Sequence, residues 1–253
     1  MKKILLLVVF LFALSLTAGR AGAVEFGVRG TYWFPTMGSS IQVDADQVDG
    51  FEFDITDDLM VDDENYPVIQ AFFRTGVHSF EFVYTYVDFS SRTILTQGRN
   101  FAGVLYPQNS QVDFALEYKS IDLRYGYRLV NWDDVLNGFS LYGLVDLKMY
   151  DGETSLKATG LDNSKSFNAF IPMFGLDFHL TLLADLLKAR IVFAIEPVGD
   201  SNAGEVAAHV AWTPAPFVDV VGGYRVLLLR IEEDDLKFSH RLNGPYVGLT
   251  VSF

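Results

Sequence analysis

Long stretches of this chain alternate between two kinds of side chain. In the segment 79–88, every second position is aromatic, and the aromatic series Phe80, Phe82, Tyr84, Tyr86 is interleaved with Glu81, Val83, Thr85, Val87. A period of two predicts a β-strand, because successive side chains of a strand point to opposite faces. One face is large and uncharged, whereas the other mixes small, polar and charged residues. Such a strand must bury its apolar face against a second sheet or against hydrocarbon.

Ten segments of this kind follow one another along the chain. They span roughly 24–34, 67–76, 79–95, 110–129, 139–157, 165–180, 188–198, 203–213, 217–232 and 242–253. Most reach the ~9–11 residues that a tilted membrane strand requires. Compact joints alternate with longer connections, which is typical of barrels with short periplasmic turns and long external loops. The sequence predicts an all-β, antiparallel up-and-down transmembrane β-barrel of ten strands, with eight strands as the alternative.

The outward, apolar face of the predicted barrel can be written strand by strand. It comprises Phe26, Val28, Tyr32, Phe80, Phe82, Leu123, Tyr125, Phe170, Phe174, Phe178, Ile191, Phe193, Val206, Trp212, Tyr224, Val247 and Leu249. The structural rival is a soluble two-sheet sandwich in which these residues form the core. Whole strand faces free of charge favour lipid, because a soluble barrel would place its charges outside.

The N-terminus has the features of a secretory signal peptide. Lys2 and Lys3 precede an almost unbroken apolar run from Ile4 to Leu16, and Ala21-Gly22-Ala23 is a small-residue cleavage site. The apolar run is too short for the ~20 residues of a spanning helix. We therefore expect residues 1–23 to be a cleaved signal peptide and residues 24–253 to form the barrel domain.

Charge and cysteine content exclude some classes of protein. The chain has 19 Lys and Arg against 32 Asp and Glu, and the predicted signal removes three of the basic residues. Without a basic stripe to neutralise phosphates, nucleic acid is not an expected partner. The chain has no cysteine, so its stability must come from packing and hydrogen bonding without disulfides.

The last predicted strand carries the most specific mark. Tyr246, Gly248, Thr250 and Ser252 alternate with Val247, Leu249, Val251 and the C-terminal Phe253. This ending resembles the terminal signature of bacterial outer-membrane barrels, and the whole pattern resembles the small barrels of the OmpW and OmpA kind. The resemblance implies an outer-membrane location in a Gram-negative bacterium, lipid and lipopolysaccharide as surroundings, and Phe253 as a signal for the barrel-assembly machinery. We expect the barrel to be a monomer.

The opposite faces of the strands predict the barrel interior. They supply eight carboxylates, seven Lys or Arg and two histidines: Glu25, Arg29, Arg74, Glu81, Asp122, Arg124, Arg128, Asp146, Lys148, Asp177, His179, Arg190, Glu196, Glu205, His209, Asp219 and Arg225. A barrel of ten strands is close in diameter to an eight-stranded barrel, whose lumen is filled by side chains. It is much narrower than a porin, which has ~16–18 strands. Opposite charges in a narrow lumen should pair, because an unpaired buried charge is costly. We predict a plugged interior, with a narrow, porin-like channel for small or hydrophobic solutes as the alternative.

The alternation changes phase near Lys119 and Ser120. Apolar residues occupy even positions before this point and odd positions after it, as Leu116 and Leu123 illustrate. Two explanations are open: a β-bulge, or the upper limit of the bilayer.

The segment 35–66 is the most biased in composition. It holds ten acids and no Lys or Arg. The spacing of Asp44, Asp46 and Asp49 resembles the start of an EF-hand calcium loop. The third acid comes one position later than in that loop, and the Glu that ends the loop is missing. A solvated external loop is the favoured interpretation, and a weak divalent-cation site is the alternative.

No pattern of residues indicates catalysis or a cofactor. Nucleotide, zinc-protease and nucleophile-elbow motifs are absent from the sequence. Ser239-His240, predicted in the last external loop, and Asp177 with His179 are the candidates for a lipid-modifying or proteolytic site. We expect interior carboxylates to pair with His179 and His209. The sequence thus favours a non-enzymatic barrel with a structural or interaction role, without cofactor.

Overall fold

The computed structural model describes residues 24–45, 50–132, 138–183, 186–197, 202–233 and 236–253. The predicted signal peptide lies outside the described residues. The described residues form fourteen strands: β1 (Val24–Trp33), β2 (Thr36–Val43), β3 (Phe53–Asp54), β4 (Tyr66–Thr75), β5 (His78–Ile94), β6 (Arg99–Phe101), β7 (Val104–Tyr106), β8 (Gln111–Trp132), β9 (Phe139–Ala158), β10 (Leu161–Leu182), β11 (Leu187–Ile195), β12 (Asn202–Ala215), β13 (Val218–Glu233) and β14 (Leu236–Ser252). Among the described residues no helix has the length and apolar character needed to cross a membrane.

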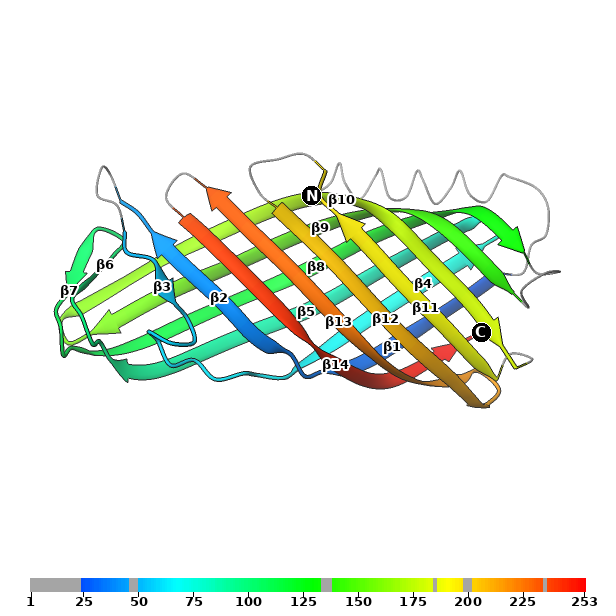
Figure 1. The fold of residues 1–253 in the computed structure, drawn as a ribbon, viewed down its shortest axis with the longest axis horizontal. Helices are drawn as coiled ribbons and strands as arrows, with labels where there is room; N and C mark the ends of the chain where they lie inside the picture. The colour runs from blue at the N-terminus through cyan, green and yellow to red at the C-terminus, as the bar shows by residue number, and fades with distance from the viewer. Residues whose placement is uncertain (1–23, 46–49, 133–137, 184–185, 198–201, 234–235) are drawn as a thin grey trace.

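Ten of these strands close into a barrel. The order is β1-β4-β5-β8-β9-β10-β11-β12-β13-β14, every pair is antiparallel, and β14 returns to β1 with Val28 opposite Val251. Figure 1 shows the strands running obliquely around one elongated body. The ten-stranded up-and-down barrel expected from the sequence is confirmed. Closure matters because it leaves no unpaired edge within a membrane.

The strands differ greatly in length, and this divides the barrel into two halves. β8 and β10 have 22 residues each, whereas β11 has nine. At ~3.3 Å per residue, the longest strands extend about 70 Å, far beyond a hydrocarbon core of ~30 Å. We call the end that holds Val24 and Ser252 basal, and the end that holds β6 and β7 distal (Figure 1).

The distal wall separates into two sheets. β10 pairs with β11 only from Phe174 onward, so Leu161–Met173 pair with β9 alone. On the other side of the molecule, β2 continues the direction of β1 and pairs with β14, and β3 pairs with β2. β5, β8, β9 and β10 therefore form one distal sheet, and β13, β14, β2 and β3 form the other.

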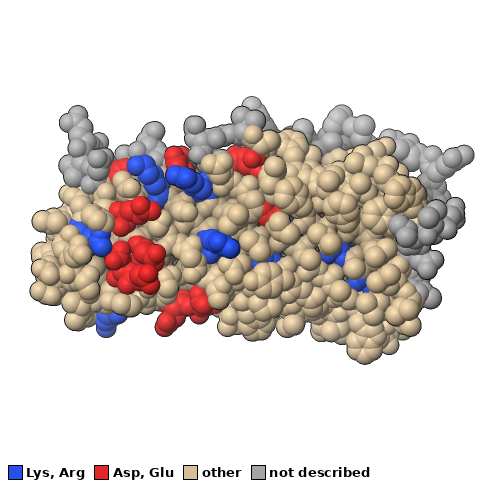
Figure 2. Space-filling model, in the orientation of Figure 1, with Lys and Arg blue, Asp and Glu red and all other residues tan. Residues whose placement is uncertain are grey.

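The basal half has an apolar exterior. The residues predicted to face outward are exposed or half-buried there, including Phe26, Phe174 and Trp212 with about half of their surface exposed. In Figure 2 the coloured charges gather on the distal half of the visible face, and the basal half is mostly uncharged. On β8 the apolar outward positions run from Ile121 to Leu129, a length that matches one hydrocarbon layer.

The distal half has the inverse pattern. Its outward positions include Asp88, Lys119 and Asp151, while apolar side chains are buried between the two sheets. Its large buried side chains include Phe53, Phe89, Phe101, Tyr106, Phe114, Phe167 and Phe238, none more than 2% exposed. The residues that the rival sandwich would have buried, such as Phe26 and Trp212, are exposed, and the distal core between the two sheets is formed by other side chains.

The change of phase at Lys119 and Ser120 occurs in a regular strand. Lys119 pairs with Tyr86 and with Asp151 without any shift of register, and the irregularity of β8 lies between Arg128 and Val130. The β-bulge considered for residues 119–120 is therefore wrong. The side chains keep their alternation while their surroundings change, as expected where a strand leaves the bilayer.

The segment 35–66 is not a solvated loop in the described residues. It contains β2 and β3, and its apolar side chains Phe53, Ile55, Leu59 and Val61 are at most 3% exposed. Acids between them accept backbone hydrogen bonds, as Asp54 does from Thr56 and Asp57. The segment packs into the distal core, so the expectation of a solvated loop is wrong.

Candidate functional site: the barrel interior

A buried lysine stands at the centre of the basal half. Lys148, on β9, is fully buried, and its Nζ lies 2.5 Å from Asp122, 2.7 Å from Glu205 and 3.2 Å from Asp146. These three carboxylates belong to β8, β12 and β9, so the ammonium joins opposite sides of the barrel. Their oxygens lie within 4.8 Å of one another, a spacing suited to a metal ion. The lysine ammonium occupies the centre of this acidic cluster and supplies the positive charge there.

Two arginines complete this central cluster. Arg124 contacts Asp146 at 3.0 Å and Glu205 at 2.8 Å. Arg225 lies 3.2 Å from Glu205, and its guanidinium is 4.9 Å from the ring centre of Trp33. Three cations therefore neutralise three carboxylates across the full width of the lumen. Such pairing offsets the large cost of removing charges from water.

A second network lies toward the basal end. Arg190 is 2.7 Å from both Asp177 and Glu81, and Arg74 lies between Glu81 at 3.7 Å and Glu25 at 3.0 Å. These residues come from β11, β10, β5, β4 and β1. The chain of ion pairs thus crosses the barrel from β10 to β1, below the central cluster.

The remaining predicted interior residues have varied surroundings. Asp219 pairs with Lys188 at 3.3 Å and accepts a hydrogen bond from Thr213 at 2.6 Å. Glu196 lies where β11 ends, and its backbone N–H bonds to Ala203. Arg128 lines the basal cavity described below. Of the seventeen predicted interior residues, Arg29, Arg128, Glu196 and His209 have no ion-pair partner within the part of the chain that the structure describes.

The histidines differ in their partners. His179 Nε2 lies 2.9 Å from Asp177, the carboxylate expected from the sequence. His209 shares a 2.9 Å hydrogen bond with the Tyr246 hydroxyl, so the expected pairing with a carboxylate is wrong.

His240 lies in β14 rather than in a loop, which corrects the sequence-based position. Ser239 faces outward, and the side chain that meets His240 Nδ1 is Ser39 Oγ at 2.6 Å. His240 Nε2 shares a 2.9 Å hydrogen bond with the Tyr118 hydroxyl. This group lies above the apolar belt, between the two distal sheets, and burial lowers the pKa of His240 to about 3. The neutral imidazole therefore bridges the sheets.

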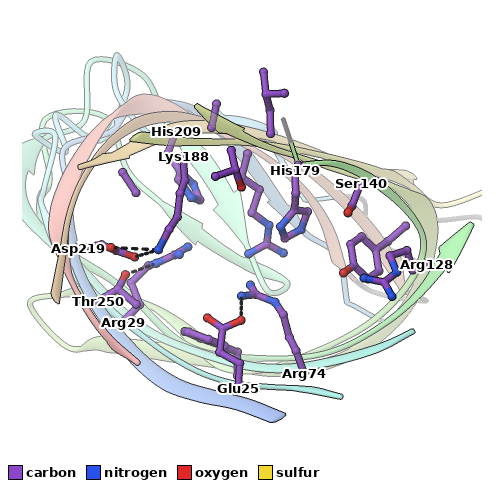
Figure 3. Close-up of a pocket in the computed structure, with 18 of the residues that line it drawn as sticks. Glu25, Arg29, Arg74, Arg128, Ser140, His179, Lys188, His209, Asp219 and Thr250 are labelled. Atoms are coloured by element: carbon purple, nitrogen blue, oxygen red, sulfur yellow. Dashed lines mark hydrogen bonds and ion pairs between the residues drawn. The ribbon is translucent and has the colours of Figure 1, made fainter. Parts of the chain in front are cut away.

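A cavity opens at the basal end. Its volume is about 670 Å³, and its lining includes Glu25, Arg74 and Arg190 of the second network. Figure 3 shows Glu25, Arg29, Arg74, Lys188, His179, His209 and Asp219 around it. We call this cavity the basal vestibule.

Side chains of two connecting segments meet at the distal end. Arg99, the first residue of β6, contacts Asp58 at 3.1 Å, and its guanidinium lies 3.8 Å from the Phe51 ring centre. Phe53 and Phe101 meet edge to face, with ring centres 6.2 Å apart. The two segments cover the distal core from opposite sides of the barrel.

The acidic candidates for metal binding are only partly described. Asp44 accepts hydrogen bonds from the Gly50 backbone at 2.7 Å and from Gln42 at 2.9 Å. Asp46 and Asp49 lie outside the described residues. The divalent-cation site therefore stays a prediction.

Several interior residues escaped the sequence-based reasoning. Lys188 lies at the predicted start of its strand and points inward to Asp219. Its position two residues before Arg190 is a signal that could have found it. Ser39 and Tyr118 could not be found in this way, because their contact with His240 spans 201 and 122 residues of sequence.

Comparisons with known proteins agree with this architecture. No protein-family model and no curated protein sequence matches the chain. Among solved structures, the outer membrane protease OmpT of Escherichia coli is similar with a TM-score of 0.56 and 11% identity, covering 90% of this chain and 97% of OmpT. The β domain of the Bordetella autotransporter BrkA matches with a TM-score of 0.45 and 13% identity over 92% and 100% of the two chains. Ail of Yersinia pestis matches with a TM-score of 0.36 and 12% identity over 92% and 100%.

These likenesses concern the fold. The chain has the architecture of a small outer-membrane β-barrel protein, which is the broader part of the resemblance seen in the sequence.

Proposed function

We propose that this protein is a closed, non-enzymatic barrel of the bacterial outer membrane that holds a rigid β-sandwich outside the cell. The observation that carries the proposal is the side chain of Lys148, fully buried and in contact with three carboxylates in the middle of the lumen. An open aqueous pore would hydrate this ammonium. Above it, the apolar core between the distal sheets fills the remaining interior.

The surroundings of the barrel follow from its surface. The apolar belt, the band of outward apolar side chains that spans Ile121 to Leu129 on β8, faces lipid. The charged distal half contacts the lipopolysaccharide headgroups and extends beyond them. The short joints, the start of β1 and the end of β14 all lie at the basal end. Outer-membrane barrels have their short turns on the periplasmic side, so the basal vestibule faces the periplasm. Phe253, whose backbone pairs with Phe26, is the signal offered to the barrel-assembly machinery, and the protein works as a monomer without cofactor.

The rival function is a narrow channel. Planar-bilayer recording of the purified protein separates the two, because the closed barrel is expected to give no discrete conductance steps. Replacing Lys148 with alanine provides a matched comparison, since it removes the ammonium from the centre of the lumen. Reproducible steps from the unmodified protein would show that the interior conducts ions and would overturn the closed barrel.

A catalytic role is the second rival, favoured by one distance. Ser39 Oγ and His240 Nδ1 are 2.6 Å apart, as a nucleophile and its base would be. The two residues are only 5% and 1% exposed and belong to an apolar core. Their burial supports a structural role. Peptide or lipid A turnover that disappears in Ser39→Ala and His240→Ala would overturn it.

A further inference from the structure

The basal vestibule is lined by more positive than negative side chains. Its charged lining residues are Arg29, Arg74, Arg128, Lys188 and Arg190, with Glu25 and Asp219. The imidazoles of His179 and His209 also reach it (Figure 3). Five cations against two carboxylates give the cavity an electrostatic preference for anions, strengthened by the low-dielectric walls of the barrel.

Most of these cations already have a partner. Arg190 is matched by Asp177, and Lys188 by Asp219. Arg74 contacts Glu25 at 3.0 Å. Within the part of the chain that the structure describes, Arg29 and Arg128 have no carboxylate at ion-pair distance.

Arg29 is the more deeply buried of these two arginines. Its side chain lies on β1 and is only 8% exposed. Its Nε donates a 2.8 Å hydrogen bond to Thr250 Oγ1, and the rest of the guanidinium points into the vestibule (Figure 3). Arg190 and Arg74 repel it, whereas Glu81 and Tyr246 act in the opposite direction. A buried cation with repulsive neighbours is costly unless an anion compensates it.

We propose that the basal vestibule binds a phosphate-bearing anion, with Arg29 as its principal ligand. The planar guanidinium donates paired hydrogen bonds to the oxygens of a phosphate, and Thr250 fixes its orientation. Two or more neighbouring cations suit a dianion better than a single carboxylate. The volume of about 670 Å³ lies in the range of small-molecule sites and exceeds that of inorganic phosphate alone. The cavity therefore has room for inorganic phosphate or for a small phosphate monoester, entering by the basal mouth.

Isothermal titration of the full chain in detergent tests this site. The two probes are inorganic phosphate and glycerol 3-phosphate, at low and at moderate salt. Saturable binding of one phosphate group per chain is expected. Arg29→Gln is expected to weaken it at least tenfold, and Thr250→Val several-fold, because the guanidinium loses its orienting hydrogen bond. Arg92→Gln is the matched control, since Arg92 is exposed on the distal half and pairs with Asp113.

The outcomes show which phosphate compound binds and whether the site exists. Tighter binding of glycerol 3-phosphate identifies an organic monoester, tighter binding of inorganic phosphate identifies free phosphate, and equal binding shows that the site recognises the phosphate group alone. Absence of saturable binding by the unmodified chain would overturn the proposal. So would equal affinities of Arg29→Gln and the unmodified chain, or an equal loss in Arg92→Gln. If Arg29→Gln does not fold, as judged by circular dichroism, the Thr250→Val comparison decides. Conductance is not involved, so this result is independent of the closed lumen.

Discussion

The basal and distal halves of this molecule are built from the same strands but have opposite interiors. Around Lys148 the inside of the barrel is ionic and the outside is apolar. Around Phe114 the inside is apolar and the outside carries charges such as Lys119 and Asp151. The ladder of β8 crosses the boundary with its register unchanged. The difference shows that the solvent outside, rather than the strand itself, decides which face must be apolar.

The two interiors should also respond differently to substitution. The basal interior depends on matched charge, so that loss of one partner leaves an uncompensated charge buried among the others. The distal interior depends on close packing, so that loss of volume is what costs stability. Substitutions made in each half can therefore test which interactions stabilise that half.

The largest effect is expected in the central cluster. Lys148→Met keeps most of the side-chain volume but leaves Asp122, Asp146 and Glu205 facing one another without the ammonium. We expect a loss of about 3–5 kcal/mol in the free energy of unfolding, as for other broken buried ion pairs. Urea unfolding in lipid vesicles measures it. Lys157→Met is the control, since Lys157 and Asp162 form an exposed pair. A loss no greater than in this control would show that the buried charges are not essential to stability.

The distal core gives the corresponding packing test. Phe238 is 1% exposed between the two distal sheets, and Phe238→Ala should cost about 3–4 kcal/mol through lost burial and the cavity left behind. Phe170→Ala removes the same atoms from a side chain that is 61% exposed, and its cost should be much smaller. The same unfolding assay compares the two variants. Equal costs would contradict a packed core in the distal half.

The outer surfaces can be compared by placing one charge on each. Phe82 faces outward from β5 within the apolar belt, and Ser90 faces outward from the same strand in the distal half. Phe82→Arg should destabilise the protein in vesicles by about 2–3 kcal/mol, because the charge enters hydrocarbon. Ser90→Arg should change stability by less than about 0.5 kcal/mol, as surface substitutions usually do. Similar effects at both positions would place the bilayer elsewhere on the barrel.

Much of this architecture follows from the alternation of residues along each strand. Polarity identified the inward positions Asp122, Arg124 and Lys148 because a period of two is a local property. The distal strands β2 and β3 were missed because the acids near them suggest a loop, and only the packing of Ile55 and Leu59 shows otherwise. The partners within the lumen could not be predicted either. Which carboxylate meets Lys148 depends on barrel curvature and strand stagger, which bring β9 close to β12 in space.

The smallest effect concerns the polar bridge between the distal sheets. His240 is buried with Ser39 and Tyr118, and its pKa of about 3 lies below the value near 6.5 expected in the unfolded chain. The unfolded state therefore binds a proton more readily, and this contribution to stability is complete above pH 6.5 and falls as the pH drops toward 3. Between pH 7 and pH 5 the unmodified protein should lose on the order of 1–2 kcal/mol more than His240→Gln, which cannot titrate. Unfolding curves of both proteins across this interval measure the difference, and parallel pH profiles would mean that His240 is not held neutral between the two sheets.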